Sequence, residues 1–264
     1  MKRRRCFWVI TLVLTLFITG MLTYPRVGCT KDILLVYSGA GMRKPMDKIG
    51  AAFEKKYGVA VNYNYAGSNT LLSQIELTKK GDVYMPGATM YIDKAKEKGF
   101  VDYERPVAYH IPVIAVPEGN PAEITSLKDL TKPGVRVILG DPKAAACGKI
   151  AKKILEKNKI YGEVQKNVIA HTATVNELVV YLCIKQTAAS IIWKASLLET
   201  KDKTDVVEIP TKQNCIKVIP VGKLTFSENK KMAKKFVDFV ASPEGKAIFE
   251  KCGFTTYPDP GHEK

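Results

Sequence analysis

The 264-residue sequence has little cysteine and little histidine, with six and three residues respectively. No two cysteines form a Cys-x-x-Cys pair, which excludes a structural zinc ribbon, and six scattered cysteines are too few for a disulfide-stabilised scaffold of this length. The sequence also lacks internal repeats and low-complexity segments. Its 46% hydrophobic and 25% charged residues exclude an intrinsically disordered chain, and its length suits one large domain or two lobes.

The N-terminus has the pattern of an export signal. Basic residues 2–5 precede an apolar run over residues 7–22, in the order found in secretory signals. The run is shorter than the roughly 20 residues of a spanning helix, but no clean small-x-small cleavage site follows it. We therefore expect residues 1–28 to be a signal peptide or a membrane anchor, with the folded part beginning near Asp32 outside the cytoplasmic membrane.

Cys29 follows this segment directly, after a glycine. A Gly-Cys pair just beyond an apolar run resembles the lipobox of bacterial lipoproteins, in which the cysteine becomes lipidated. Arg26 stands where that motif has leucine. A lipidated and an unmodified Cys29 both remain open, so the protein is expected to be periplasmic or to lie on the outer face of the membrane.

Positive charge is in excess, with 41 Lys+Arg against 26 Asp+Glu and a formal net charge of +15. Residues 1–28 carry five of the basic residues and no acidic one, so about +10 remains beyond them. The basic pairs are scattered and have no aromatic residues between them, which does not favour nucleic-acid binding. A positive exterior can still steer anions toward a cleft.

From Asp32 onward, apolar runs alternate with segments of helical periodicity. This alternation predicts an α/β protein of two lobes, each a mostly parallel sheet flanked by helices. Extended runs over 107–116, and over 206–210 with 216–224, are predicted to be the crossings of a hinge. Residues 32–110 and 211–260 then form lobe 1, and residues 111–210 form lobe 2. Expected strands include 33–37, 59–65, 83–85, 135–139, 168–170 and 189–193; expected helices include 126–130, one from 148, and 175–183.

Three predicted strand-to-helix turns consist of small, uncharged residues, at 38–41, 67–70 and 144–148. Ligands of open parallel sheets bind at such turns, where the free N–H groups of helix N-termini favour anions. None of the turns matches GxxxxGK[ST] or GxGxxG, so a nucleotide site is not indicated. The turns predict a site for a small anion.

Several segments resemble the molybdate- and tungstate-binding proteins of ABC importers. The resemblance runs in order from about Asp32 to Phe254, through the segments 35–41, 65–76, 140–148, 173–178, 242–245 and 253–254. It implies a type II periplasmic-binding-protein-like fold and a monomeric, extracytoplasmic receptor. Such a receptor is not an enzyme and needs no cofactor. It closes its two lobes on a molybdate or tungstate ion and delivers the ion to a membrane permease.

The resemblance also implies ligand-binding residues, position by position. Gly41 stands where the family has a serine, which leaves a backbone N–H there and Ser38 as a nearby hydroxyl; Trp193 stands where a tyrosine is common, and its indole N–H can replace the hydroxyl. The implied side-chain donors are Ser68, Ser38 and Trp193, and the implied backbone donors are Gly41, Cys147 and Val175.

The identity of the anion remains open at this point. In the tungstate-selective branch of the family two acidic residues complete an octahedral site, but this chain has Ala145 and Thr174 at those places, which favours a tetrahedral ion held by neutral donors. Sulfate is an alternative. Phosphate is a weaker one, because its proton needs an acceptor and the turns offer only donors.

An exported thiol enzyme is the alternative from a different class. Cys147 opens a predicted helix, where a thiol pKa is depressed, and His110 or His171 could act as its base. If oxidised, the four cysteines after Cys29 could pair in three ways, and the sequence does not choose between them. These are Cys147, Cys183, Cys215 and Cys252.

Overall fold

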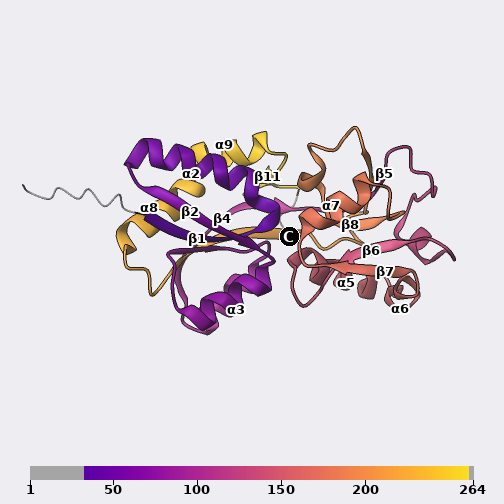
Figure 1. Cartoon of the computed structure of the whole chain (residues 1–264), viewed down its shortest axis with the longest axis horizontal. Helices are drawn as coiled ribbons and strands as arrows, with labels where there is room; N and C mark the ends of the chain where they lie inside the picture. The colour runs from indigo at the N-terminus through magenta and orange to yellow at the C-terminus, as the bar shows by residue number, and fades with distance from the viewer. Residues whose placement is uncertain (1–32, 262–264) are drawn as a thin grey trace, which may run out of the picture. The chain divides into compact units, whose positions relative to one another are not determined.

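A six-stranded sheet with the order β11-β4-β10-β3-β1-β2 forms the first half of the computed structural model, which describes residues 33–261 (Figure 1). Its strands are β1 (Ile33–Gly39), β2 (Ala60–Ala66), β3 (Val83–Met85), β4 (Val101–His110), β10 (Lys217–Leu224) and β11 (Thr255–Thr256). Its helices are α2 (Arg43–Tyr57), α3 (Ser68–Thr78), α4 (Thr89–Glu97), α8 (Lys230–Val240) and α9 (Pro243–Lys251). We call this half lobe 1.

The second half, lobe 2, is built on two smaller sheets, β8-β5-β9 and β6-β7, which a parallel bridge between Val137 and Ala189 brings together. Its strands are β5 (Pro112–Pro117), β6 (Val137–Gly140), β7 (Val168–Thr172), β8 (Ser190–Trp193) and β9 (Thr204–Glu208). Its helices are α5 (Ala146–Lys157), α6 (Tyr161–Gln165) and α7 (Val175–Cys183). Short 3-10 turns are η1 (Ala40–Met42), η2 (Leu127–Thr131) and η3 (Lys194–Leu197).

The predicted α/β alternation is confirmed, but the expectation of mostly parallel sheets is wrong in detail. Strand β1 pairs in parallel with β2 and β3, whereas β10 pairs antiparallel with both β3 and β4. The chain leaves lobe 1 along β4 and returns to it along the neighbouring β10. These two strands therefore run in opposite directions. In lobe 2, β5 likewise pairs antiparallel with β8 and β9.

The chain passes between the halves at two places of unequal length. Ile111 alone separates β4 from β5, so the predicted extended run 107–116 is two strands and not one. The return passage covers residues 209–216, between β9 and β10. The Asn214 amide donates to the carbonyl oxygens of Pro112 and Ile209, at 2.9 and 3.3 Å, and so ties the two passages together.

Helix α2 shows how local sequence builds lobe 1. Met46, Ile49 and Phe53 recur at helical spacing and are fully buried. The helix ends at Gly58, which has φ +72° and donates to the Glu54 carbonyl, a left-handed C-cap that glycine adopts without strain. The Phe53 ring packs edge-on against Phe236 with centroids 5.0 Å apart.

Two predicted helices of lobe 2 differ from expectation. The segment expected to be helical over 126–130 is the 3-10 turn η2, fixed by a capping box in which Ser126 and Asp129 exchange hydrogen bonds. Helix α5 begins at Ala146, two residues before the expected start, because the small residues of the turn adopt helical geometry. Within residues 33–261 no helix combines the length and apolar character needed to cross a membrane. Cys29 and the rest of the predicted export segment lie outside the described residues.

Candidate functional site

The three small-residue turns meet at one cavity between lobe 1 and lobe 2. Its lining residues come from both lobes and carry no carboxylate and no lysine or arginine: Gly39, Ala40, Gly41, Met42, Ala66, Gly67, Ser68, Gly87, His110, Ala145, Ala146, Cys147, Thr174, Val175 and Trp193. No group of three or more potential metal-ligating side chains occurs anywhere in the part of the chain that the structure describes. The cavity is therefore suited to a ligand held by neutral groups.

The cavity is small. Its volume is about 20 Å³. A cavity of this order suits a small ligand.

Three helices begin at the cavity without a side-chain cap. Helices α3, α5 and α7 have Gly67, Ala145 and Thr174 at their N-cap positions, and none of these side chains accepts a hydrogen bond from a backbone N–H of the first turn. The Thr174 hydroxyl instead donates to the Glu177 carboxylate at 2.8 Å. Helices α8 and α9, which lie elsewhere in lobe 1, are capped by Asn229 and Ser242. The first N–H groups of a helix have no partner inside the helix. The Asn69 N–H of α3 donates to the Ala144 carbonyl at 3.2 Å, and the starts of the three helices otherwise present donors and positive dipole ends to the cavity.

Ser68 is the first residue of α3 and is only 2% exposed. Its hydroxyl oxygen accepts a hydrogen bond from the Gly87 N–H at 3.0 Å, and its carbonyl oxygen accepts one from the Tyr84 hydroxyl at 2.7 Å. A serine hydroxyl has one hydrogen to donate. Because Gly87 occupies an acceptor position of the oxygen, the Ser68 hydrogen is free to be donated into the cavity.

Two glycines allow the lobes to approach at this site. A Cβ atom at Gly67 would lie 2.5 Å from the Ala144 carbonyl oxygen and 2.9 Å from that of Ala173, both in lobe 2. A Cβ atom at Gly41 would lie 2.9 Å from Cγ1 of Val175. Such approaches leave no room for a side chain, which explains why a serine is not accommodated at position 41 beside Val175.

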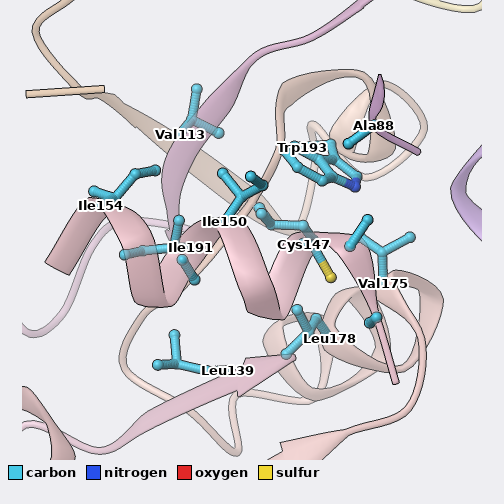
Figure 2. Close-up of a cluster of buried hydrophobic side chains, with 14 of the residues drawn as sticks. Ala88, Val113, Leu139, Cys147, Ile150, Ile154, Val175, Leu178, Ile191 and Trp193 are labelled. Carbon is cyan, nitrogen blue, oxygen red and sulfur yellow. The ribbon is translucent and has the colours of Figure 1, made fainter. Parts of the chain in front are cut away.

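Trp193 and His110 form a stacked pair in the wall of the cavity. Their ring centroids are 4.3 Å apart, with an interplanar angle of 5°, and Trp193 is 3% exposed. Cδ1 of Trp193 lies 3.6 Å from the position that a Cβ at Gly41 would take, so the pyrrole edge of the indole faces that turn. Figure 2 shows the indole nitrogen on the edge nearest Val175. This orientation suits the donor role implied for Trp193.

His110 ends β4, immediately before the one-residue passage at Ile111. Its Nδ1 lies 2.8 Å from the Gly87 carbonyl oxygen, an acceptor, so Nδ1 carries the hydrogen and Nε2 carries a lone pair in the neutral ring. Nε2 is buried and has no hydrogen-bond partner in residues 33–261. Burial lowers the pKa of His110 to about 4, and the Gly87 hydrogen bond opposes this shift only in part.

The expectation that Cys147 has a depressed pKa is wrong. Burial raises the pKa of its thiol to about 12, and the nearby Glu177 charge adds to this, against weaker opposing hydrogen bonds from the Gly148 and Cys147 N–H groups. Figure 2 shows the Cys147 side chain among the apolar side chains of Ile150, Val175 and Leu178. Such a thiol is protonated at neutral pH and is not an activated nucleophile. His171, the other proposed base, is exposed on β7 and does not line the cavity.

The structure brings together five of the six residues that the sequence singled out: Gly41, Ser68, Cys147, Val175 and Trp193 line the cavity. Ser38 does not, although it directly precedes the lining Gly39, and its buried hydroxyl has no partner in the described residues. The four cysteines that the structure describes are free thiols: Cys147, Cys183, Cys215 and Cys252.

Gly87 and the role of His110 were missed as parts of the site. Gly87 follows the carboxyl end of β3, so the rule that found the other three turns would have found this one too. The role of His110 depends on a carbonyl group 23 positions earlier in the chain and on a stacking partner from lobe 2. No local sequence pattern carries that information.

The buried His110 predicts acid sensitivity of the empty protein. Its pKa falls from 6.5 to about 4 on folding, so between these pH values the unfolded chain binds a proton that the folded chain does not. The free energy of unfolding should therefore fall as the pH is lowered from 7 to 4, by up to about 3 kcal/mol from this residue. Urea denaturation at both pH values measures it. His110→Gln should lose this increment of the pH dependence, and the exposed His171→Gln should keep it; equal pH profiles for the wild type and His110→Gln would contradict the assignment.

A family model described as bacterial extracellular solute-binding protein matches residues 34–255. A curated protein of Haemophilus influenzae, named as a binding protein without a stated ligand, is 29% identical over 221 residues, covering 84% of this chain and 90% of that protein. The molybdate-binding protein ModA of Mycobacterium tuberculosis is 25% identical over 223 residues, covering 84% of this chain and of that protein.

The fold is also found among solved structures. The sulfate-binding protein SubI of Mycobacterium tuberculosis superposes with a TM-score of 0.77 at 16% identity, covering 87% of this chain and 88% of that one. At this identity the likeness concerns the fold alone. It confirms the expected α/β fold of type II binding proteins.

Proposed function

Because the chain belongs to the family of bacterial extracellular solute-binding proteins, we propose that its solute is a small tetrahedral oxyanion, which it delivers to the permease of an ABC importer. Membership in this family makes the chain a binding protein and not an enzyme, as the sequence predicted. The observation that carries the proposal is the convergence of three uncapped helix N-termini and the free Ser68 hydrogen on a cavity without charged side chains.

A dianion suits such a cavity because the site offers hydrogen-bond donors and helix dipoles. Backbone N–H groups at the starts of α3, α5 and α7 and the hydroxyl of Ser68 can each donate to an oxygen of the ion. Charge-assisted hydrogen bonds of this kind are short and about twice as strong as neutral ones. The ion is then held without a counter-charge, and its negative charge is shared among aligned dipoles.

Molybdate or tungstate is our preferred ligand, and sulfate is the second candidate. Molybdate is the ion in the name of the ModA relative, which is similar over 84% of this chain, whereas the sulfate-binding SubI shares the fold. All three ions are tetrahedral, and the described side chains that line the cavity include no carboxylate, lysine or arginine. The lining residues Ala145 and Thr174 supply no carboxylate for an octahedral site, which supports tetrahedral binding.

We further propose that residues 32–110 with 211–260, and residues 111–210, act as two lobes that close on the ion. Contacts already join lobe 1 to lobe 2 at the cavity, including the Asn69 N–H donated to the Ala144 carbonyl at 3.2 Å and the Asn176 amide donated to the Ala40 carbonyl at 3.3 Å. Opening about the passages at Ile111 and 209–216 would release the ion to the permease. We propose that the protein acts as a monomer outside the cytoplasmic membrane. It is attached to the membrane through a lipidated Cys29 or an uncleaved N-terminal segment, or it is released when the signal peptide is cleaved.

Calorimetric titration of the purified protein with molybdate, tungstate, sulfate and phosphate at matched ionic strength tests the proposal. One-to-one binding of molybdate or tungstate, with sulfate much weaker, is the expected result. Sulfate binding more tightly than both metal oxyanions would overturn the preferred ligand and leave the oxyanion receptor in place. Absence of binding for all four ions would overturn the oxyanion proposal itself.

Ser68→Ala should weaken oxyanion binding by about 1–3 kcal/mol, because it removes one charge-assisted hydrogen bond to the ion. The dissociation constant should rise by roughly 5- to 150-fold. Ser73→Ala is a matched control, since Ser73 is on the same helix and is exposed to solvent. An unchanged affinity in Ser68→Ala would remove Ser68 from the ligand shell.

A further inference from the structure

The ring of His110 differs from the hydrogen-bond donors that line the cavity, because one of its nitrogens is an acceptor. Gly87 fixes it through the carbonyl oxygen 2.8 Å from Nδ1, Trp193 stacks on its face, and Phe254 lies beside it with ring centroids 5.7 Å apart. These contacts hold the imidazole in one orientation and assign its hydrogen to Nδ1. The remaining nitrogen, Nε2, is buried, has no partner in residues 33–261, and belongs to a side chain of the cavity wall.

An unpartnered lone pair conflicts with a fully ionised oxyanion in the same small cavity. Molybdate and sulfate oxygens carry only lone pairs, so a ligand oxygen that reached the neutral Nε2 of this lining residue would meet a second acceptor. A single proton between them turns this repulsion into a charge-assisted hydrogen bond. Every other polar group identified at the cavity as a ligand partner is a donor, so Nε2 is the place where such a proton can reside.

We infer that His110 takes up one proton when a fully ionised oxyanion binds, so that this proton lies between Nε2 and a ligand oxygen. The inference rests on the proposed function and adds to it a coupling between ligand binding and pH. In the empty site the ring is neutral, because burial disfavours its charged form. A bound dianion reverses this preference, since an opposite charge nearby favours the imidazolium.

Within residues 33–261, no charged side chain in contact with His110 favours the imidazolium, so the bound ligand is the group that would raise its pKa. Cys147 of α5 lines the same cavity as a protonated thiol, Glu177 lies in the first turn of α7, and Lys217 of β10 is opposite His110 in the strand ladder. Tyr109 precedes His110 on β4, whereas Gly87, Trp193 and Phe254 bring no charge. Burial and the Gly87 carbonyl set the protonation of the empty ring, without a contribution from a charged side chain.

The sign of the pH dependence follows from this linkage. Below neutral pH and above about 4, the complex holds a proton that the empty protein lacks, so acid favours the complex. The affinity for a dianion should rise as the pH is lowered through this window, by up to about tenfold per pH unit. A receptor that uses only fixed N–H and O–H donors would show no such trend.

Calorimetry of the wild-type protein with molybdate and with sulfate at pH 5.5, in two buffers of different ionisation enthalpy, counts the protons taken up. We expect about one proton per bound ion. His110→Gln, whose side-chain amide donates without titrating, should bind the ion with an uptake near zero, and the exposed His171→Gln should keep the wild-type value. His110→Asn provides a second variant if the glutamine does not fit.

The outcomes separate this inference from the function on which it rests. Tight binding by the wild type without proton uptake would overturn the role of His110 and leave the oxyanion receptor intact. The same would follow if His110→Gln kept a full proton uptake. Failure of the wild type to bind any of the oxyanions would instead overturn the proposed function.

Discussion

Gly67→Ala should reduce oxyanion affinity roughly 5- to 150-fold while leaving the free energy of unfolding nearly unchanged. The added methyl group would lie 2.5 Å from the Ala144 carbonyl oxygen and 2.9 Å from that of Ala173, so it collides with lobe 2 backbone. Forcing one carbon into such a contact costs typically 1–3 kcal/mol, which corresponds to this loss when the cost falls on the arrangement in which the two lobes are in contact. Gly67 has φ −64°, which alanine adopts without strain, so the backbone itself is not the cause.

Gly162→Ala provides the matched control, because a Cβ at that position meets no atom within 4 Å. Titration calorimetry gives the affinities, and urea denaturation gives the stabilities. If Gly67→Ala bound the ion as tightly as the wild type, the approach of the lobes at this turn would not be part of ligand binding. If it unfolded much more easily than Gly162→Ala, the contact would be structural.

Phe53→Ala should have the opposite profile, with a loss of about 3–5 kcal/mol in the free energy of unfolding and little change in affinity once folded. Phe53 is fully buried in lobe 1, with ring centroids 5.0 Å from Phe236 and 5.6 Å from Phe239. Removing the ring leaves a cavity in this aromatic cluster, and none of its members lines the ligand cavity. Urea denaturation measures the loss.

Phe53→Leu is the graded control, since it keeps most of the buried volume and should lose less stability than Phe53→Ala. A large fall in affinity under native conditions for Phe53→Ala would mean that the cluster also positions the ligand site. Together with Gly67→Ala, this variant separates residues that hold lobe 1 together from residues that let the two lobes meet.

Elements with a strong periodic or continuous apolar pattern were predictable from the sequence. Strand β1 was predicted from its continuous apolar run, and α7 was predicted with the bounds that the structure gives it. The short α6 and the turns η1 and η3 were not predicted, because elements of three to five residues have too few positions to establish a period. Strand direction was mispredicted where β10 returns between β3 and β4, since the order of strands depends on tertiary packing.

The parts of the site that are formed by strand-to-helix turns could be predicted from the sequence. The parts that depend on contacts between residues far apart in the chain could not. Ser68 and Gly41 follow strands β2 and β1, so the rule for parallel sheets brings them to one edge. The sign of the Cys147 pKa shift was mispredicted because the position at a helix start favours the thiolate, whereas complete burial, which the sequence did not reveal, disfavours it more strongly. Ser38 lies one residue too early on β1 to line the cavity.

The stacked pair of His110 and Trp193 gives this protein an optical reporter of its own. The sequence contains two tryptophans, Trp8 in the N-terminal segment and Trp193 in the wall of the ligand cavity. Indole emission responds to the polarity around the ring and to the charge of an imidazole in contact with it. A protein without its first 28 residues therefore carries a single tryptophan, which can be excited selectively over the tyrosines. It lies where binding of the ion, approach of the lobes and protonation of His110 would each change its fluorescence.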